Sequence, residues 1–508
     1  MTNGSWAARR GAVRAARVVL LSLGVLALAA CTLEPRYREP ALPVPEHWPI
    51  PPTTPAASAA SAAGATAAAA ESGPPVPANR GRIGGTRSAV DIGWRDFFAD
   101  PHLQQIIAEA LADNRDLRVA VLDIQLARSQ YLVQRANSLP QIDASGSYTK
   151  ERLPAAEFGF PITAAFYQVG VALSSFELDL FGRVRSMNHA ALQQYFAQSE
   201  ARRSAQLSLI AEVAQAYVTL QSDRQLLQVA QDTLRSQQAS YDITAKEHAH
   251  GQVSGLDVAQ ADTTVEQARS DVARYQGSVA QDSDALQLLV GAPVDTAPLP
   301  AALDDDTFGI AALPAQLPAT VLLRRPDVLE AERQLRAANA DIGAARAAFF
   351  PAVDITGDAG NLSTDFAKLF APGTGTWQYE PQVSLPIFHG GQLVGDLAEA
   401  KVNRAIAVAQ YEKAIQSAFR EVADALALTG TLEREREAQE ALVRAAGRAY
   451  ELSQQRYKDG LNSYLDVLDS QRTYYSAQQT LIAAELAQQD NRVTLYKALG
   501  GGWREKSR

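Results

Sequence analysis

Residues Tyr450–Val467 read YELSQQRYKDGLNSYLDV, and an earlier stretch, Tyr241–Val258, reads YDITAKEHAHGQVSGLDV. The two stretches align without a gap. The aligned pairs are Tyr241 with Tyr450, Gly251 with Gly460, Ser254 with Ser463, Leu256 with Leu465, Asp257 with Asp466 and Val258 with Val467. Such an alignment over an extended stretch indicates that two copies of one supersecondary unit build the chain.

A second alignment supports the duplication. NRDLRVAVLDIQLARSQYLVQRANSLPQIDASG from Asn114 matches RRPDVLEAERQLRAANADIGAARAAFFPAVDITG from Arg324. In each copy a helical stretch leads to a proline, then to two strand-like segments, and then to a long helical region. We therefore predict repeat 1 over 91–300, repeat 2 over 301–503 and a short tail over 504–508. The expected strands are at about 140–150, 165–177, 352–361 and 377–387.

Long proline-free regions surround the glycines at Gly251 and Gly460. No proline occurs between Gly182 and Gly291, or after Gly391. A helix over 184–249 would extend about 100 Å at 1.5 Å per residue. Because each glycine has a twin in the other repeat, the acids that follow them indicate helical-hairpin turns rather than a catalytic cluster. The expected hairpin tips are Gly251, Ser254 and Gly255, and Gly460 and Ser463.

The strand-like segments alternate apolar and polar residues. In WQYEPQVSL, Trp377, Tyr379 and Val383 point one way, while Glu380 and Gln382 point the other. Alternation of this kind is typical of a transmembrane β-barrel, with lipid outside and water inside. A half-buried soluble sheet is the alternative. Four strands would leave open edges in lipid, whereas twelve strands from three chains would enclose a water-filled bore.

The helix after Gly460 carries two apolar stripes. One has 3-4 spacing from Leu465 to Tyr496, and a weaker one recurs at every seventh residue from Val467 to Leu495. A helix in a two-stranded coiled coil needs only one such apolar stripe. Two stripes predict a neighbouring helix on each side, as in a wall or cylinder of helices.

The N-terminus has the pattern of a lipoprotein signal peptide over 1–30. Four arginines precede an apolar stretch, VVLLSLGVLALAA, that ends in Leu-Ala-Ala-Cys at Cys31. That stretch is too short for a comfortable membrane span, so we expect cleavage before Cys31 and lipidation of its thiol. A buried or free cysteine after an ordinary signal peptide is the alternative. Thr32, rather than Asp, follows the cysteine, which favours the outer membrane. Residues 31–90 are expected to hold the lipidated N-terminus and a flexible Ala/Pro/Ser-rich tether, whose Ala/Pro/Ser-rich part runs over about 51–87.

Several function classes are disfavoured. The net charge is −9 with no basic block, which argues against nucleic-acid binding. Cys31 is the only cysteine, and His248 and His250 are two apart, a poor spacing for metal ligands on a helix. No Walker loop, nucleophile elbow or HExxH motif occurs. We therefore expect no enzyme activity, no metal and no cofactor beyond the covalent lipid.

Six motifs together resemble the outer-membrane factor (TolC-like) family of Gram-negative tripartite efflux systems, in its lipidated OprM-like/NodT branch. They are CTLEPRYREP, FELDLFGRVR, LLRRPDVLEAERQLRAANADIGAARAAFFP, LPIFHGGQL, SYLDVLDSQR and LYKALGGGW. The resemblance implies a mixed α+β membrane protein. Its homotrimer would have a 12-stranded transmembrane β-barrel continuous with a 12-helix periplasmic α-barrel.

The function implied is a passive outer-membrane exit duct for drugs or other toxic small molecules. A periplasmic adaptor would dock on it, and an inner-membrane proton-driven transporter of the resistance–nodulation–division type would feed it. A type I protein secretion channel is the alternative within this class. A lipid-anchored coiled-coil protein without a pore is the alternative outside it.

The resemblance also assigns a gate near the second turn. Leu465 matches a position that closes the pore, Asp469 and Arg472 match gate positions, and Arg456 and Tyr457 match latch positions. The repeat-related acids Asp257 and Asp466 lie nearby and join this candidate gate; the alternative is that these charges only solvate helix ends.

Two further motifs have structural interpretations. In RRPD, Pro326 and Asp327 suit the first turn of a helix. In LPIFHGGQL, Gly390 and Gly391 suit a tight junction between a strand and a helix.

Overall fold

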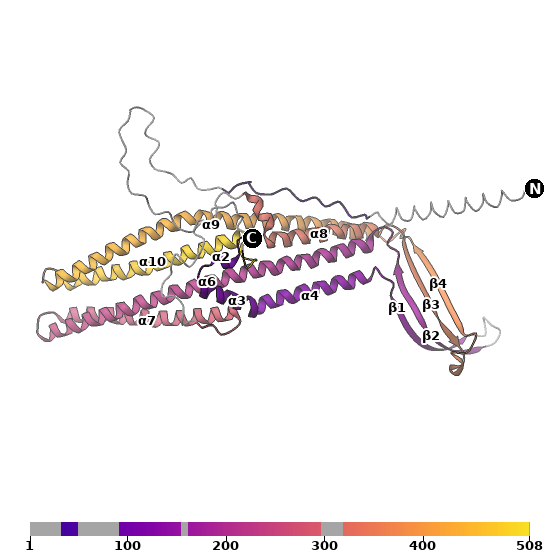
Figure 1. The fold of residues 1–508 in the computed structure, drawn as a ribbon, viewed down its shortest axis with the longest axis horizontal. Coiled ribbons are helices and arrows are strands. Elements are labelled where there is room, and N and C mark those ends of the chain that lie inside the picture. The colour runs from indigo at the N-terminus through magenta and orange to yellow at the C-terminus, as the bar shows by residue number, and fades with distance from the viewer. Residues whose placement is uncertain (1–31, 49–90, 154–160, 296–317, 507–508) are drawn as a thin grey trace, which may run out of the picture. The chain divides into compact units, whose positions relative to one another are not determined.

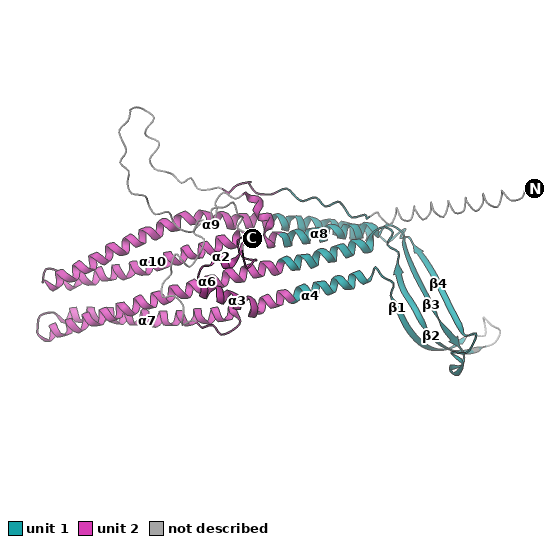
Figure 2. Ribbon diagram, in the orientation of Figure 1, with its two compact units in different colours: residues 1–41, 122–200, 329–413 teal, residues 42–121, 201–328, 414–508 magenta. Residues whose placement is uncertain are grey.

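The computed structural model describes residues 32–48, 91–153, 161–295 and 318–506. The chain divides into two compact units, which are described separately below (Figure 2). Unit 1 holds residues 1–41, 122–200 and 329–413, and unit 2 holds residues 42–121, 201–328 and 414–508.

Helices dominate the described chain, and four strands interrupt them (Figure 1). The helical elements are α2 (Trp94–Phe97), α3 (Pro101–Asp113), α4 (Arg115–Ala136), α6 (Arg183–Ala249), α7 (Gly255–Val290), η3 (Ala319–Arg324), α8 (Pro326–Ala347), η4 (Phe366–Lys368), α9 (Gln392–Lys458) and α10 (Tyr464–Ala498). The strands are β1 (Ile142–Leu153), β2 (Ile162–Glu177), β3 (Ala352–Ser363) and β4 (Gly375–Ser384).

The strands of unit 1 form one antiparallel sheet in the order β1-β2-β3-β4. All four lie where the alternating segments were expected, with boundaries that differ by a few residues. The register between β2 and β3 shifts between Leu173 and Phe176. Gly170 pairs with Gly360, and a Cβ on Gly360 would lie 2.2 Å from the Val169 carbonyl oxygen. Glycine at this pair therefore allows the two strands to approach closely.

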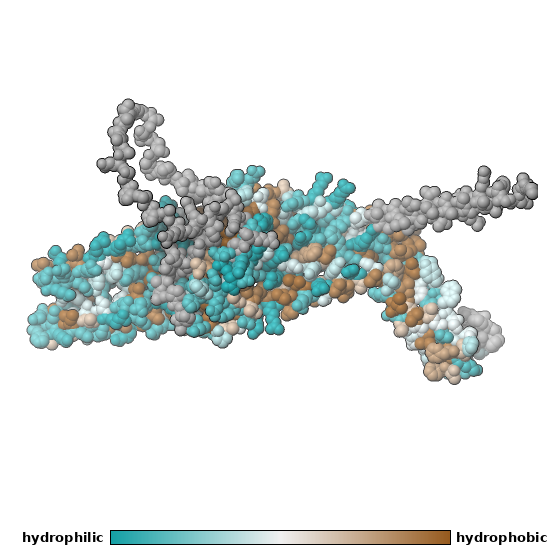
Figure 3. Space-filling view, in the orientation of Figure 1, coloured by the Kyte–Doolittle hydropathy of each residue, from teal (hydrophilic) through white to brown (hydrophobic). Residues whose placement is uncertain are grey.

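Large apolar side chains remain exposed on this sheet and its connections. Figure 3 shows apolar surface at both ends of the sheet: at the end that carries the β3–β4 connection, and at the end next to the helical part of unit 1. Trp377 on β4 is 79% exposed, and Phe370 in the β3–β4 connection is 77% exposed. Ile387 and Phe388, which follow β4, are 91% and 87% exposed. An apolar surface of this extent marks an interface with lipid or protein.

Residues 32–48 belong to the expected lipidated N-terminus, and those of unit 1 make specific side-chain contacts, whereas the expected tether at about 51–87 lies outside the described residues. In unit 1, the Glu34 carboxylate lies 3.0 Å from Nδ1 of His189. The Tyr37 hydroxyl donates to Glu332 at 3.1 Å. The amino-acid composition gave no sign of these contacts because their partners are far away in the sequence.

The main core of unit 2 forms around aromatic residues of the segment 91–98, which reads DIGWRDFF. Phe97 stacks on Tyr496 with ring centroids 3.8 Å apart, and the Tyr496 hydroxyl donates to the Ile92 carbonyl at 2.8 Å. Trp94 and Arg95 donate their backbone N–H groups to the carbonyls of residues 504 and 505. The C-terminal segment is thereby bound to the first helical turn of this unit.

The two longest helices, α6 and α9, contain 67 residues each. A helix of that length extends about 100 Å, which confirms the long helix expected before Gly251. In the described part of the chain, no helix combines the length and apolarity needed to cross a membrane.

Candidate functional site

Both long helices end in the same turn. Gly251 and Gly460 have φ of 75° and 71°, a left-handed conformation in which only glycine is unstrained. At the first turn, Gln252 N donates to the Glu247 carbonyl at 2.9 Å, and Gly251 N donates to the residue 248 carbonyl at 2.8 Å. The second turn repeats both bonds at the equivalent residues. This pair of bonds is the Schellman motif, so the expected hairpin turns are confirmed.

The returning helices also begin alike. The Ser254 N–H and hydroxyl donate to the Asp257 carboxylate at 2.9 and 2.7 Å. Ser463 donates in the same way to Asp466 at 3.2 and 3.1 Å. Each pair is a capping box, and Gly255 begins α7 just after the first one. The hydrogen bonds from Ser254 lower the pKa of Asp257. Both acids therefore have a local role in starting a helix.

Other candidate gate residues lie just before the second turn. Tyr457 donates its hydroxyl to Glu247 at 3.0 Å, which joins the end of α9 to the end of α6. Burial, followed by this bond to Glu247, raises the pKa of Tyr457 to about 12. Arg456 donates from Nε to the side-chain oxygen of Asn462 at 2.9 Å, across the turn. Arg456 therefore stabilises the turn, while Tyr457 links the two hairpins.

Leu465, Asp469 and Arg472 lie on one exposed side of α10. Their spacing of four and three residues places them on one helical face. Leu465 is 60% exposed, and Asp469 and Arg472 are exposed as well. The opposite side of α10 is buried, with Val467 only 5% exposed. The structure brings these three residues to one face of α10, and their role as a gate stays a prediction.

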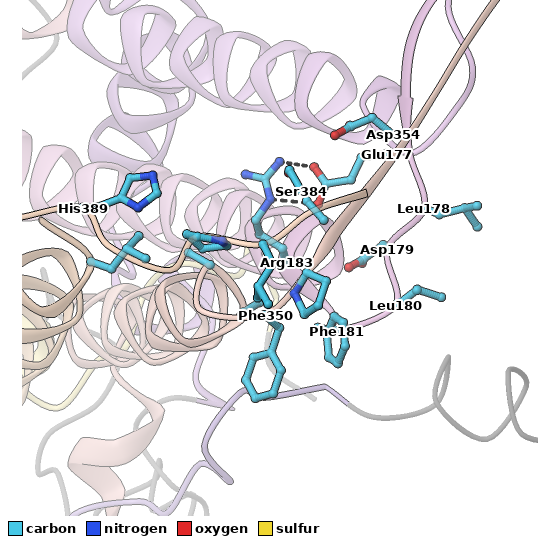
Figure 4. A pocket seen from close by; sticks show the side chains of 17 residues that line it. Glu177, Leu178, Asp179, Leu180, Phe181, Arg183, Phe350, Asp354, Ser384 and His389 are labelled. Atoms are coloured by element: carbon cyan, nitrogen blue, oxygen red, sulfur yellow. Dashed lines mark hydrogen bonds and ion pairs between the residues drawn. The ribbon is translucent and has the colours of Figure 1, made fainter. Parts of the chain in front are cut away.

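A cavity of about 490 Å³ lies in unit 1, where strands pass into helices (Figure 4). Arg183 donates from Nε to Glu177 at 2.9 Å, and the close-up shows this pair beside Asp354. Phe181 stacks on Phe350, with ring centroids 4.7 Å apart. Across the described ranges, no three His, Cys, Asp or Glu side chains form a group able to hold a metal ion. We assign no chemistry to this cavity.

Gly390 and Gly391, in the connection that enters α9, have φ of 58° and 90°. These left-handed conformations confirm the expected tight junction between β4 and the helix.

The RRPD motif begins helix α8 at Pro326, as expected. Sequence reasoning missed the further role of Arg325, which is 5% exposed. Arg325 donates to Asp327 at 2.7 Å, to Glu421 at 2.9 Å and to the Ala498 carbonyl at 2.6 Å. The side chain thus joins the start of α8 to α9 and to the end of α10. Lipidation at Cys31 stays a prediction, because Cys31 lies outside the described residues.

Comparisons with known proteins agree with this architecture. The outer membrane efflux protein family matches residues 106–292 and 317–501. The chain is 44% identical to the toluene efflux pump outer membrane protein TtgC of Pseudomonas putida, over 96% of both chains. It is 37% identical to the cation efflux system protein CusC of Escherichia coli, over 94% of this chain and 97% of that one.

Solved structures show the same similarity. The open-state MtrE outer membrane channel of Neisseria gonorrhoeae has a TM-score of 0.81 and 36% identity, covering 94% of this chain and all of that one. A Pseudomonas aeruginosa membrane protein has a TM-score of 0.80 and 37% identity, covering 94% of this chain and 98% of that one. The chain therefore belongs to the outer membrane efflux protein family.

Proposed function

We propose that three copies of this chain form the outer-membrane exit duct of a tripartite efflux pump. The duct conducts drugs or other toxic small molecules passively to the outside. The observation that carries this proposal is the match of both halves of the chain to one efflux family, at 44% identity to an efflux pump outer membrane protein over nearly the whole length. The relatives' names mention toluene and cations, so the cargo class differs among close relatives.

The sheet supports a trimeric barrel. In the described chain β1 and β4 are the outer strands of the sheet, and each has one unpaired edge. Open edges are not tolerated in lipid, so each β4 would pair with β1 of the next copy. Three copies then give twelve strands. The exposed apolar residues of β4, Trp377, Tyr379 and Val383, would face the lipid.

The helical hairpins support a periplasmic tunnel. Three copies of α6–α7 and α9–α10 would give twelve helices, whose tips are the turns at Gly251 and Gly460. These tips, with Ser254, Gly255 and Ser463, would dock a periplasmic adaptor, and an inner-membrane transporter of the resistance–nodulation–division type would supply the cargo. A lipid on Cys31 would add a second attachment to the outer membrane.

The exposed face of α10 supports the gate. In a trimer, Leu465 would form an apolar ring at the tunnel mouth. Asp469 and Arg472 would lie one and two turns above it, where opposite charges from neighbouring copies attract each other. Asp257 and Asp466 would contribute negative charge near the mouth while they cap their helices. Breaking the Asp469–Arg472 attraction should therefore loosen the closed state.

Planar lipid bilayer recordings test both levels of the proposal. The purified wild-type protein should form ion-conducting trimers, and Asp469→Ala or Arg472→Ala should raise the single-channel conductance. Arg448→Ala is the matched control, because Arg448 is an exposed arginine on α9 outside the gate. A wild-type protein that forms no channel refutes the duct. Gate variants that conduct like Arg448→Ala refute the gate while leaving the duct intact.

A further inference from the structure

The register of the sheet assigns each strand residue to one of two faces. Successive side chains of a strand point to opposite faces, and paired residues of neighbouring strands share a face. One face carries all the acidic residues of the four strands, which are Asp143, Glu151, Glu177, Asp354, Asp358 and Glu380. We call it the acidic face. The other face carries the exposed side chains of Ile142, Trp377 and Val383, and we call it the apolar face.

Two basic residues near the end of β1 share the apolar face. Lys150 and Arg152 lie on it because each is an even number of residues from Ile142. They are the only charged residues that the four strands place on this face, and we call them the basic pair. Both side chains are exposed, and among the residues that the structure describes neither has an ion-pair partner. The pair therefore presents two positive charges to solvent beside an apolar surface.

An aromatic cluster separates the basic pair from the aliphatic part of the apolar face. The Tyr148 ring lies 4.7 Å from the Tyr167 ring, and the Tyr167 ring lies 5.5 Å from the Phe366 ring, measured between centroids. Tyr148 and Phe366 are 55% and 69% exposed. Girdles of aromatic residues mark the membrane–water interfaces of a transmembrane β-barrel. In the proposed barrel, the cluster therefore indicates the level at which hydrocarbon gives way to lipid headgroups.

The basic pair lies just beyond that level. β1 begins after α4 and runs to the loop end of the sheet, away from the helical part of unit 1 (Figure 1). Lys150 and Arg152 follow Tyr148 by two and four residues, which is about 7 and 13 Å along the strand. At this depth, long basic side chains keep their apolar stems over the hydrocarbon and place their charged ends among the headgroups. The two residues are only about 7 Å apart, so both can reach one phosphate group, to which arginine can donate two parallel hydrogen bonds.

We propose that the basic pair binds a phosphate group of lipopolysaccharide in the outer leaflet of the outer membrane. This inference rests on the proposed duct, in which the loop end of the sheet faces the outside. Lipopolysaccharide is the anionic lipid of that leaflet, and its lipid A part is a phosphorylated disaccharide that carries acyl chains. The acyl chains lie along the apolar face below the aromatic cluster, and a lipid A phosphate accepts hydrogen bonds from Lys150 and Arg152. The acidic face, which repels phosphate, lines the bore instead.

Native mass spectrometry of the purified protein, titrated with bisphosphorylated lipid A in detergent, tests the inference. The wild-type trimer should bind one lipid A on each protomer. Lys150→Gln combined with Arg152→Gln should raise the apparent dissociation constant on the order of tenfold, because two positive charges next to an anionic headgroup are lost. Arg128→Gln combined with Lys401→Gln is the matched control. It removes the same two residue types from exposed positions on α4 and α9, and it should bind lipid A like wild type.

Two other lipids and one conservative variant test which chemical group is recognised. Lipid A without its phosphates should bind the wild-type protein on the order of tenfold more weakly, and phosphatidylglycerol should displace lipid A poorly. Lys150→Arg keeps the positive charge and should keep the affinity for lipid A. The double variant of the basic pair should remain trimeric and conduct like wild type, which shows that its loss of binding does not come from misfolding.

The outcomes that overturn the inference are separate from those that refute the duct. A double variant of the basic pair that binds lipid A as tightly as the control variant overturns the inference. A wild-type protein that binds phosphatidylglycerol as tightly as lipid A also overturns it, because the site would then not be specific for the glycolipid. A protein that forms channels in planar bilayers but does not bind lipid A contradicts this inference alone, whereas a protein without channels refutes the duct.

Discussion

Replacement of Arg325 by methionine should destabilise unit 2 and leave the gate region unaffected. The arginine is nearly buried, and its three acceptors come from α8, α9 and the end of α10. Burial opposes the charge, but Asp327 and Glu421 raise the pKa of Arg325 above its usual value, so the side chain is charged at every accessible pH. Methionine fills a similar volume and donates no hydrogen bond.

The magnitude follows from the two long-range bonds. The bond to the Ala498 carbonyl, at 2.6 Å, is a buried bond from a charged donor, worth about 2 kcal/mol. The Glu421 side chain is 44% exposed, so solvent screening reduces its ion pair to about 1 kcal/mol. The contact with Asp327 spans two residues and contributes little to tertiary structure. The total is about 3 kcal/mol. For the roughly 300 residues of unit 2, this corresponds to a fall in melting temperature of about 5 °C.

Thermal unfolding of the purified protein, followed by circular dichroism, measures this loss. The melting temperature of Arg325→Lys should lie between those of wild type and Arg325→Met. The lysine ammonium keeps the positive charge but lacks the planar guanidinium group that can donate to several acceptors at once. Glu421→Gln should cost about 1 kcal/mol alone and much less in the Arg325→Met background. If Arg325→Met melts within about 1 °C of wild type, the two long-range bonds do not stabilise unit 2 as expected. If Glu421→Gln costs as much as the arginine substitution, the bond to the Ala498 carbonyl contributes nothing, which also contradicts the prediction.

Three further predictions concern other parts of the chain. Asp257→Ala should give faster hydrogen exchange in the first turn of α7, because it removes the carboxylate that accepts from the Ser254 N–H and hydroxyl. Because the folded pKa of Asp257 is lowered from 3.8, this stabilisation is present above pH 3.8 and disappears as the pH falls through the folded pKa. Gly360→Ala should reduce the yield of folded protein, while Gly146→Ala, where a new Cβ would lie 3.9 Å from its nearest neighbour, should not. Cys31→Ser should remove the acyl chains from the mature protein, which mass spectrometry detects.

The helical hairpins were predictable from sequence because local residues determine them. A glycine with positive φ, a serine three residues later and an aspartate three residues after that are enough to end one helix and start the next. Gly251 and Gly460 supply the first of these signals, and Asp257 and Asp466 supply the last. The same signal explains the acids beyond Gly460, which cap a helix whether or not they also serve a gate.

The contacts of Arg325 and of the N-terminal segment were not predictable in this way. Arg325 binds groups 96 and 173 residues away, and Tyr37 binds Glu332 across 295 residues. No periodicity or spacing in the sequence indicates a contact between residues that lie so far apart along the chain. A proline-rich segment lacks a pattern of its own, and only the folded surface of unit 1 gives Glu34 and Tyr37 their partners.

The two repeats share the residues that each hairpin needs for its own folding and differ in the residues that join hairpins. The turns contain Gly251 and Gly460, which are equivalent, whereas Asp271, which accepts from Tyr475 of the other hairpin at 3.2 Å, is equivalent to Thr480. Thr480 donates to the Ser476 carbonyl of its own helix at 2.9 Å, whereas Asp271 binds a residue of the other hairpin. The duplication has therefore kept the local signals that fold each hairpin, while the side chains that join one hairpin to the other differ between the repeats.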